Sequence, residues 1–222
     1  TIFFGGGTPS LFSADGIDRL LTGVRTLTPL APNAEITLEA NPGTVEAGKF
    51  AEFRAAGVNR ISLGIQSFNP THLAALGRIH DAIAARRAAG LAAGHFDTFN
   101  LDLMYALPGQ TLADLRTDID TALGFQPPHL SVYHLTLEPN TPFGHSAPPN
   151  LPDDELAADM QQWLAARLVE AGYEHYETSA HARPGHQARH NLNYWRFGDY
   201  LGIGAGAHGK LSFHDRMTRQ MR

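Results

Sequence analysis

The stretch Thr1-Ile-Phe-Phe-Gly-Gly-Gly-Thr-Pro-Ser10 sets the fold, because an apolar run stops there at three consecutive glycines. The apolar run predicts a β-strand at residues 1–4. Glycines leave main-chain N–H groups uncovered at the end of such a strand, where a polar ligand can approach the backbone closely. A tight turn between a strand and a helix explains the same glycines without a ligand. We expect a binding site to begin at residues 5–8.

Strand-like and helix-like segments alternate along the rest of the chain. The alternation predicts about six βα units around a parallel sheet. We expect strands at residues 1–4, 35–38, 60–63, 98–104, 129–134 and roughly 173–178, and helices at residues 14–27, 44–56, 81–93, 112–123 and 154–171. Successive units without a long interruption favour an α/β protein with a partial (β/α)6 TIM-like open barrel of parallel strands over a flat doubly wound sheet.

Polar residues recur where the predicted strands end. Glu39 ends one apolar strand, Gln66 follows a second, and Asp102 lies within a third. Ends of parallel strands share one face of a barrel, so these side chains should converge there. An ion pair with Arg60, or capping of the next helix, explains Glu39 taken alone. Three polar groups at three strand ends favour a hydrogen-bonded small-molecule site.

Composition narrows the class of protein. The 222 residues are 43% hydrophobic and carry a formal charge of −5, with no basic stripe that would track a phosphate backbone. We therefore expect one large domain and no nucleic-acid partner. No run approaches about 18 apolar residues, which disfavours a membrane span and suggests a cytoplasmic protein. The chain contains no cysteine, so it forms no disulfide.

The histidines are concentrated in the last part of the chain. His181, His186 and His190 are spaced five and four residues apart, close to Tyr194 and Trp195. Three histidines at this spacing could ligate a transition metal, or one could bind haem iron while the aromatic rings pack on the porphyrin. A hydrated loop of ordinary histidines is the third interpretation, and the residues alone leave the choice open.

A series of motifs spans almost the whole chain. In order they are FFGGGTPS at 3–10, EANP at 39–42, RISLGIQSFN at 60–69, GRIH at 77–80, NLDLMYALPGQ at 100–110 and LSVY at 130–133. Their order and spacing resemble those of radical S-adenosylmethionine (SAM) proteins of the oxygen-independent coproporphyrinogen oxidase group. Within that group, HNLNYW at 190–195, followed by YLGIGAGAH at 200–208, resembles the signature of a branch described as haem chaperones.

The resemblance implies a protein that binds haem or a porphyrin and transfers haem to recipient haemoproteins, with membrane-associated recipients and a homodimer as further expectations. It leaves open an enzyme, an oxygen-independent coproporphyrinogen III dehydrogenase that decarboxylates two propionates. A barrel scaffold whose surface binds a partner is the third hypothesis. The residues do not decide whether the complete protein turns over a substrate.

The same resemblance implies a four-iron four-sulfur cluster on three cysteines of a Cys-x-x-x-Cys-x-x-Cys loop, with SAM on the fourth iron. We expect that loop to precede Thr1 in a longer protein. We accordingly expect a radical SAM core at residues 1–222, truncated at both ends, with residues 181–222 as a C-terminal extension. This piece alone is predicted to hold no metal and to be inactive.

The resemblance also assigns site residues. SAM contacts are expected from backbone, hydroxyl, carboxylate, amide and guanidinium groups of Gly6, Gly7, Thr8, Glu39, Gln66, Arg78 and Asp102. Thr136 and His208 are weaker matches to pocket positions. For haem, His190 is the expected iron ligand or its near neighbour, and Tyr194 and Trp195 are expected to cover the porphyrin.

Overall fold

The structure is a computed structural model that describes residues 1–44 and 47–221, and it divides into two compact units. We call Thr1–Gln187 the core unit and the residues from Ala188 onward the C-terminal unit. Residues 181 and 182, which the sequence assigned to the extension, belong to a strand of the core unit.

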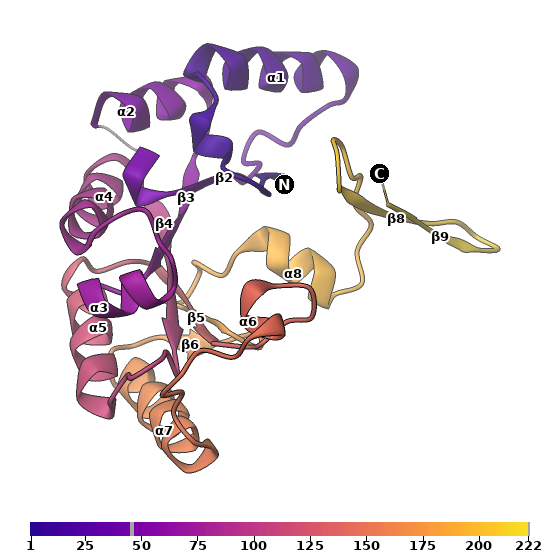
Figure 1. The fold of residues 1–222 in the computed structure, drawn as a ribbon. Helices are drawn as coiled ribbons and strands as arrows, with labels where there is room; N and C mark the ends of the chain where they lie inside the picture. The colour runs from indigo at the N-terminus through magenta and orange to yellow at the C-terminus, as the bar shows by residue number, and fades with distance from the viewer. Residues whose placement is uncertain (45–46, 222) are drawn as a thin grey trace. The chain divides into compact units, whose positions relative to one another are not determined.

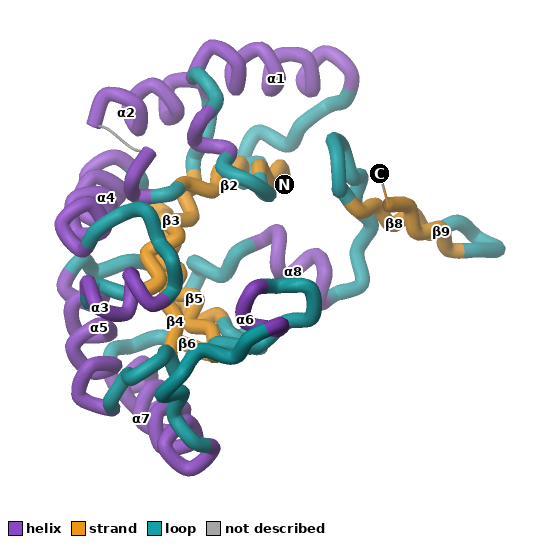
Figure 2. Tube along the Cα trace, in the orientation of Figure 1, coloured by secondary structure: helices purple, strands orange, loops and turns teal. Residues whose placement is uncertain are grey.

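The core unit is built on a seven-stranded sheet with the order β1-β2-β3-β4-β5-β7-β6 (Figures 1 and 2). Its strands are β1 (Ile2–Phe4), β2 (Ile36–Ala40), β3 (Arg60–Gln66), β4 (Thr98–Tyr105), β5 (His129–His134), β6 (Glu174–His175) and β7 (Ala180–Ala182). The helical elements are η1 (Pro9–Leu11), α1 (Ala14–Leu27), η2 (Pro42–Thr44), α2 (Ala47–Ala56), α3 (Pro70–Ala75), α4 (Ala82–His95), α5 (Leu112–Gly124), α6 (Pro142–His145) and α7 (Asp154–Glu170). Strands β1 to β5 pair in parallel, which confirms an α/β protein with a mostly parallel, TIM-like sheet.

The far edge of the sheet differs from the predicted pattern. A sixth parallel strand was expected at 173–178, but the chain turns back there: Tyr176 N–H donates to the Ala180 carbonyl. The returning strand β7 pairs antiparallel with both β5 and β6. Strand β6 therefore runs in the same direction as β5 but lies one strand further out. The turn prevents a continuous strand because it reverses the chain after two paired residues.

Most predicted helices are present, with small shifts at their ends. Helix α1 has the predicted bounds, whereas α2 begins at Ala47, and residues 45 and 46 of the predicted helix lie outside the described residues. Helix α3 was not predicted. It begins at Pro70 after Asn69, whose side chain accepts a hydrogen bond from the Thr71 N–H. Proline at the first helical position with an asparagine cap is a start signal, but only six residues follow it.

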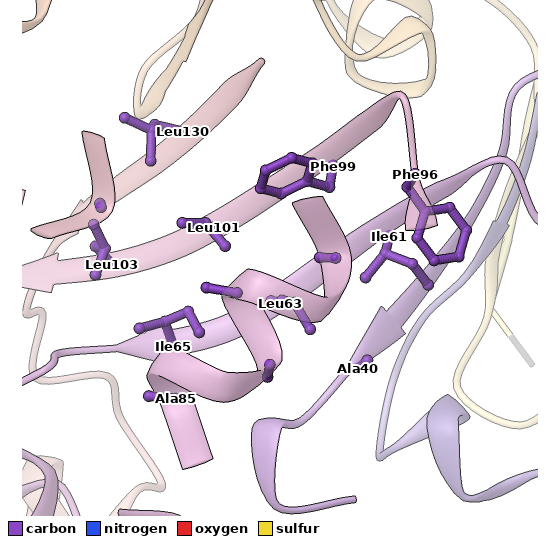
Figure 3. Close-up of a cluster of buried hydrophobic side chains, with 14 of the residues drawn as sticks. Ala40, Ile61, Leu63, Ile65, Ala85, Phe96, Phe99, Leu101, Leu103 and Leu130 are labelled. Carbon is purple, nitrogen blue, oxygen red and sulfur yellow. The ribbon is translucent and has the colours of Figure 1, made fainter. Parts of the chain in front are cut away.

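The hydrophobic core lies between the sheet and longer helices of the core unit, among them α2, α4, α5 and α7, which Figure 1 shows along one side of the strands. Leu63, Leu101 and Leu103 are almost fully buried, and Figure 3 shows them beside the helix that carries Ala85. Burying one such side chain contributes about 1.5–3 kcal/mol. Because side chains alternate along a strand, the residues between these leucines face the other side of the sheet. That second side carries the candidate site.

The C-terminal unit consists of α8 (Arg189–Trp195) and an antiparallel hairpin of β8 (His208–Ser212) and β9 (Met217–Met221). Lys210 organises it from a buried position, because its Nζ donates to the Phe197 carbonyl at 2.6 Å and to Asp199 Oδ1 at 3.2 Å. A buried ammonium is tolerated only with such partners. Neither α8 nor the hairpin was predicted from the sequence.

Candidate functional site

The glycine turn after β1 meets the end of β2. Gly6 and Gly7 both adopt positive φ angles, 78° and 56°, which favour glycine. The Gly6 N–H donates to Glu39 Oε2 at 3.2 Å. A side chain at Gly5 would place its Cβ 2.7 Å from the Phe3 ring and 3.3 Å from Glu39 Cδ. The turn is therefore packed against the carboxylate.

Glu39 is a partly buried carboxylate at this end of the sheet. Burial is the main reason that its pKa is raised, the Gly6 N–H opposes the rise, and the negative charge of Asp102 adds to it. The alternative in which Glu39 pairs with Arg60 is not formed. Two guanidinium nitrogens of Arg60, Nε and Nη2, have no hydrogen-bond partner in the described part of the chain.

A β-bulge brings the next two predicted residues together. The register of β3 on β4 shifts between Gly64 and Gln66, and Gln66 has a φ of 68°. A Cβ at Gly64 would lie 3.0 Å from Gln66 Nε2 and 3.6 Å from Arg78 Nη2. Both side chains thus lie over the bare backbone of Gly64, which pairs in register with Asp102. The bulge re-aims Gln66 toward the site.

Arg78 reaches the same place from the loop after α3. Burial lowers the pKa of its guanidinium, and its buried Nε has no hydrogen-bond partner among the described residues. The loop is held to β3 by His80, whose Nε2 lies 3.1 Å from the Ile65 carbonyl oxygen. A buried donor without a partner is costly, so this N–H is suited to an acceptor on a ligand.

Asp102 is held by two donors, one on its own strand β4 and one on the neighbouring strand β3. Asn100 Nδ2 lies 2.8 Å from Asp102 Oδ1, and the Ser62 hydroxyl donates to Oδ2 at 3.0 Å. Asn100 Nδ2 also donates to Ser62 Oγ at 2.8 Å. Burial raises the pKa of Asp102, and the hydrogen bonds from Asn100 and Ser62 oppose that rise. Both carboxylate oxygens are therefore fixed from one side.

The hydrogen bonds continue away from Asp102 through β5. His129 Nδ1 lies 2.6 Å from Asn100 Oδ1, and His129 Nε2 lies 2.6 Å from the Tyr176 hydroxyl. The Ser131 hydroxyl also donates to Asn100 Oδ1, at 3.1 Å. Sequence reasoning missed this network. The signal was the spacing of two residues between Asn100 and Asp102, and between His129 and Ser131, which places each pair on one face of its strand.

Four predicted residues thus converge beside the glycine turn: Glu39, Gln66, Arg78 and Asp102. The carboxylates can accept from hydroxyl or ammonium groups, while the amide and guanidinium can donate to a carboxylate or a ring nitrogen. Thr8 caps η1 with its carbonyl, which accepts from the Leu11 N–H. Thr136 lies on the exposed loop after β5 and donates to Glu138 Oε1 at 2.9 Å. The arrangement suits a small polar zwitterion.

The residues proposed for haem lie in the C-terminal unit. His190 and Tyr194 are four residues apart on α8, and their rings meet edge to face with centroids 4.8 Å apart. Tyr194 also contacts Tyr200, at 4.6 Å between centroids. Trp195 is 54% exposed, and His208 begins β8. An imidazole and a phenol ring therefore contact each other on this short helix, which ends at the exposed Trp195.

Residues 1–44 and 47–221 contain no group of three or more His, Cys, Asp or Glu that could hold a metal ion. Two of the three histidines considered for a metal tripod have partners within the core unit. His181 stacks on His175, with ring centroids 4.5 Å apart, and His186 Nδ1 lies 3.2 Å from Thr98 Oγ1. The described residues therefore give the tripod interpretation no support.

No described helix is long and apolar enough to span a lipid bilayer.

Comparison with known proteins shows the family to which the chain belongs. A sequence model of the radical SAM superfamily matches residues 1–122, which is more than half of the chain. The chain is 58% identical to the heme chaperone HemW of Escherichia coli (strain K12), covering 97% of this chain and 57% of that protein. It is 55% identical to the heme chaperone HemW of Haemophilus influenzae, covering 96% and 56%. The chain therefore spans little more than half the length of these relatives.

Among solved structures, the coproporphyrinogen III oxidase HemN of Escherichia coli, described as a radical SAM enzyme, superposes with a TM-score of 0.79 at 27% identity. The superposition covers 93% of this chain and 51% of that one. The strand-end residues, the mostly parallel sheet and the match over residues 1–122 lead to one conclusion. The chain belongs to the radical SAM superfamily.

Proposed function

We propose that the complete protein is a cytoplasmic haem chaperone, which binds haem and transfers it to recipient haemoproteins, membrane-associated ones included, and which binds SAM. The observation that carries the proposal is the 58% identity over 97% of this chain to a relative named as a heme chaperone. The HNLNYW segment at 190–195, which suggested the same branch from sequence, supports it. A homodimer is the form in which we expect the protein to act.

SAM is the ligand we propose for the site at the strand ends. Gly6, Gly7 and Thr8 would offer backbone and hydroxyl groups to its charged amino-acid end. Glu39 and Asp102 would accept hydrogen bonds from it. Gln66 and Arg78 would complete the pocket as donors, and the unpartnered Nε of Arg78 supports this. When bound to a reduced iron–sulfur cluster, SAM supplies a carbon radical. This chain has no cysteine thiolate for such a cluster, so we assign no step to it.

Haem is the cargo we propose for the C-terminal unit. His190 would ligate the iron, and Tyr194 and Trp195 would cover the porphyrin. The edge-to-face contact between His190 and Tyr194 and the exposure of Trp195 support this placement. A neutral imidazole is a common axial ligand, and large aromatic rings pack well on a flat macrocycle.

An oxygen-independent coproporphyrinogen III dehydrogenase is the second candidate. The structural likeness to HemN favours it. Binding several propionates, however, would call for several cations, and among the described residues at the strand ends the pocket we define contributes only Arg78. We therefore rank this activity below haem binding.

Titration of haem into the full-length protein tests the proposal. We would compare the wild type, His190→Ala and, as a matched control, His214→Ala, which changes an exposed histidine of the same unit. Wild type and control should shift the Soret band with equal affinity, and His190→Ala should bind at least tenfold more weakly. Equal haem binding by all three proteins would reject His190 as the ligand. Absence of haem binding together with decarboxylation of coproporphyrinogen III would establish the second candidate.

A further inference from the structure

The orientation of the Asn100 amide follows from the groups around it. An ionised carboxylate can only accept hydrogen bonds, so the amide atom facing Asp102 must be the Nδ2 donor. Its two hydrogens are then used by Asp102 Oδ1 and Ser62 Oγ, both at 2.8 Å. The Oδ1 atom faces His129 and must accept from it. The side chain that carries Asp102's donor is therefore fixed from the far side by an imidazole.

The protonation of His129 follows in turn. Since Asn100 Oδ1 accepts, the proton of the neutral ring must lie on Nδ1, which is 2.6 Å away. Burial and the nearby charge of Arg60 hold the pKa of His129 well below its usual value, so the ring carries no second proton. Nε2 is then an acceptor, and the Tyr176 hydroxyl at 2.6 Å must donate to it.

The three hydrogen bonds that link Tyr176, His129, Asn100 and Asp102 all point the same way: each residue donates to the next, from Tyr176 to Asp102. Resting on the proposed SAM site, we propose that Tyr176 and His129 are positioning residues: they act through Asn100 to hold the Asp102 carboxylate in one orientation toward bound SAM. Neither residue needs to touch the ligand. Tyr176 lies in the turn between β6 and β7, so this antiparallel hairpin supports a site on the parallel strands.

This series of hydrogen bonds predicts that a change at Tyr176 affects SAM binding at Asp102. Without the Tyr176 hydroxyl, His129 Nε2 loses its hydrogen-bond donor, while the Nδ1 proton still donates to Asn100 Oδ1. The imidazole is then held from one side only and can tilt, which weakens its hydrogen bond to Asn100. The Asn100 amide in turn holds the Asp102 carboxylate less firmly in one orientation. Removal of one remote hydroxyl should therefore weaken SAM binding.

A neighbouring tyrosine provides a matched control. The Tyr173 hydroxyl is also buried by the core unit and donates to the Pro127 carbonyl, which is not part of the chain from Tyr176 to Asp102. Tyr173→Phe and Tyr176→Phe each remove one hydroxyl from the same region of the fold. A general loss of stability should affect both variants, whereas loss of positioning should affect only Tyr176→Phe.

The test is SAM affinity of the full-length protein, measured by calorimetry. Tyr176→Phe should weaken binding about fivefold, the effect typical of one net hydrogen bond, while Tyr173→Phe should match the wild type. In an Asp102→Asn background, Tyr176→Phe should have no further effect, because the two residues act as one chain. Nitrogen NMR of the His129 ring should show the proton on Nδ1 in the wild type and in both variants, with the Nε2 signal shifted only in Tyr176→Phe, where that nitrogen has lost its hydrogen-bond donor.

The outcomes separate this inference from the proposed function. If the wild type binds SAM and the two tyrosine variants bind it equally, the positioning role is overturned and the SAM site stands. An Nε2 proton on His129 in the wild type would also overturn it. If the wild type does not bind SAM, both the proposed site and the positioning role fail.

Discussion

The two faces of the same strands contrast sharply. On one face of β4, Leu101 and Leu103 are buried beneath the helices, and on the other Asn100 and Asp102 form a hydrogen-bonded network. The residues alternate along a single strand, so the sequence assigns the two tasks one residue at a time. The comparison shows that the residues that stabilise this fold and the residues of the candidate site lie on opposite faces of the same sheet.

The polar face opposes stability where the apolar face contributes to it. Burial raises the pKa of both Glu39 and Asp102, which means that their charged forms are disfavoured in the folded protein. Hydrogen bonds from Gly6, Ser62 and Asn100 compensate in part. Substitutions on the apolar face should therefore mainly lower stability, and substitutions on the polar face should mainly lower SAM affinity.

The largest expected effect on stability comes from the apolar face. Leu101→Ala should lower the free energy of unfolding by about 3 kcal/mol, because it removes buried methyl groups and leaves a cavity. Urea denaturation would measure this. Leu27→Ala, at a side chain that is 89% exposed, is the control and should change stability by less than about 0.5 kcal/mol. Equal effects of the two changes would contradict the assignment of the core face.

A buried base should give nearly as large an effect, visible only in acid. Burial first, and then the nearby His175, lower the pKa of His181 to about 4. The unfolded chain binds its proton near pH 6.5, so stability is lost as the pH falls from about 6.5 to about 4. The loss should reach about 3 kcal/mol. We would measure the free energy of unfolding against pH for the wild type and for His181→Phe, and expect the wild type to lose stability relative to the variant only between these two pH values. If the two curves run parallel, His181 takes up its proton in the folded protein as readily as in the unfolded chain.

Asp102 should give the opposite pH dependence. Its pKa is raised in the folded protein, so its favourable contribution is present below about pH 4 and is lost as the pH rises through the raised value. The free energy of unfolding of the wild type, relative to that of Asp102→Asn, should therefore be lower at pH 7 than at pH 4, as denaturation of both proteins would measure. SAM affinity should fall in the variant at pH 7, where the wild-type carboxylate is ionised, and the difference should shrink at pH 4. If the wild type instead becomes more stable relative to the variant at pH 7, Asp102 forms an ion pair in the folded protein.

The smallest effect on stability is expected at Gly64. Gly64→Ala places a Cβ near the flexible ends of Gln66 and Arg78, which can move, so stability should change by less than about 1 kcal/mol. SAM affinity should fall about tenfold, since both donors are displaced. Gly94→Ala, with no atom within 4 Å of its Cβ, is the control and should leave binding unchanged. Unchanged binding in Gly64→Ala would exclude Gln66 and Arg78 from the pocket.

Much of the core unit follows from the sequence, because repeated βα units give strong periodic signals. Strand β5 and helix α1 have the predicted bounds, Glu39 and Gln66 lie near the ends of β2 and β3, and Asp102 lies within β4, as expected. The convergence followed from topology alone, since parallel strands end on the same side. Arg78 was found only through the family resemblance, because it lies on a loop whose path no periodic pattern encodes.

Other features depend on interactions that a sequence pattern does not carry. The bulge at Gln66 changes which face a residue occupies, so alternation misleads beyond Gly64. The hairpin of β6 and β7 results from a turn at residues 176–179 with no strong turn signature. In the C-terminal unit, the hairpin of β8 and β9 is anchored by Lys210, a residue that propensity would place at the surface.

The insertion of β7 has a consequence for behaviour in concentrated solution. It leaves β6 as the outermost strand of the sheet, and β6 has only two paired residues, Glu174 and His175, both exposed and polar. A neighbouring molecule therefore finds few backbone groups to pair with and a carboxylate in its way. The hairpin of β6 and β7 therefore also protects this edge of the sheet from pairing with another molecule.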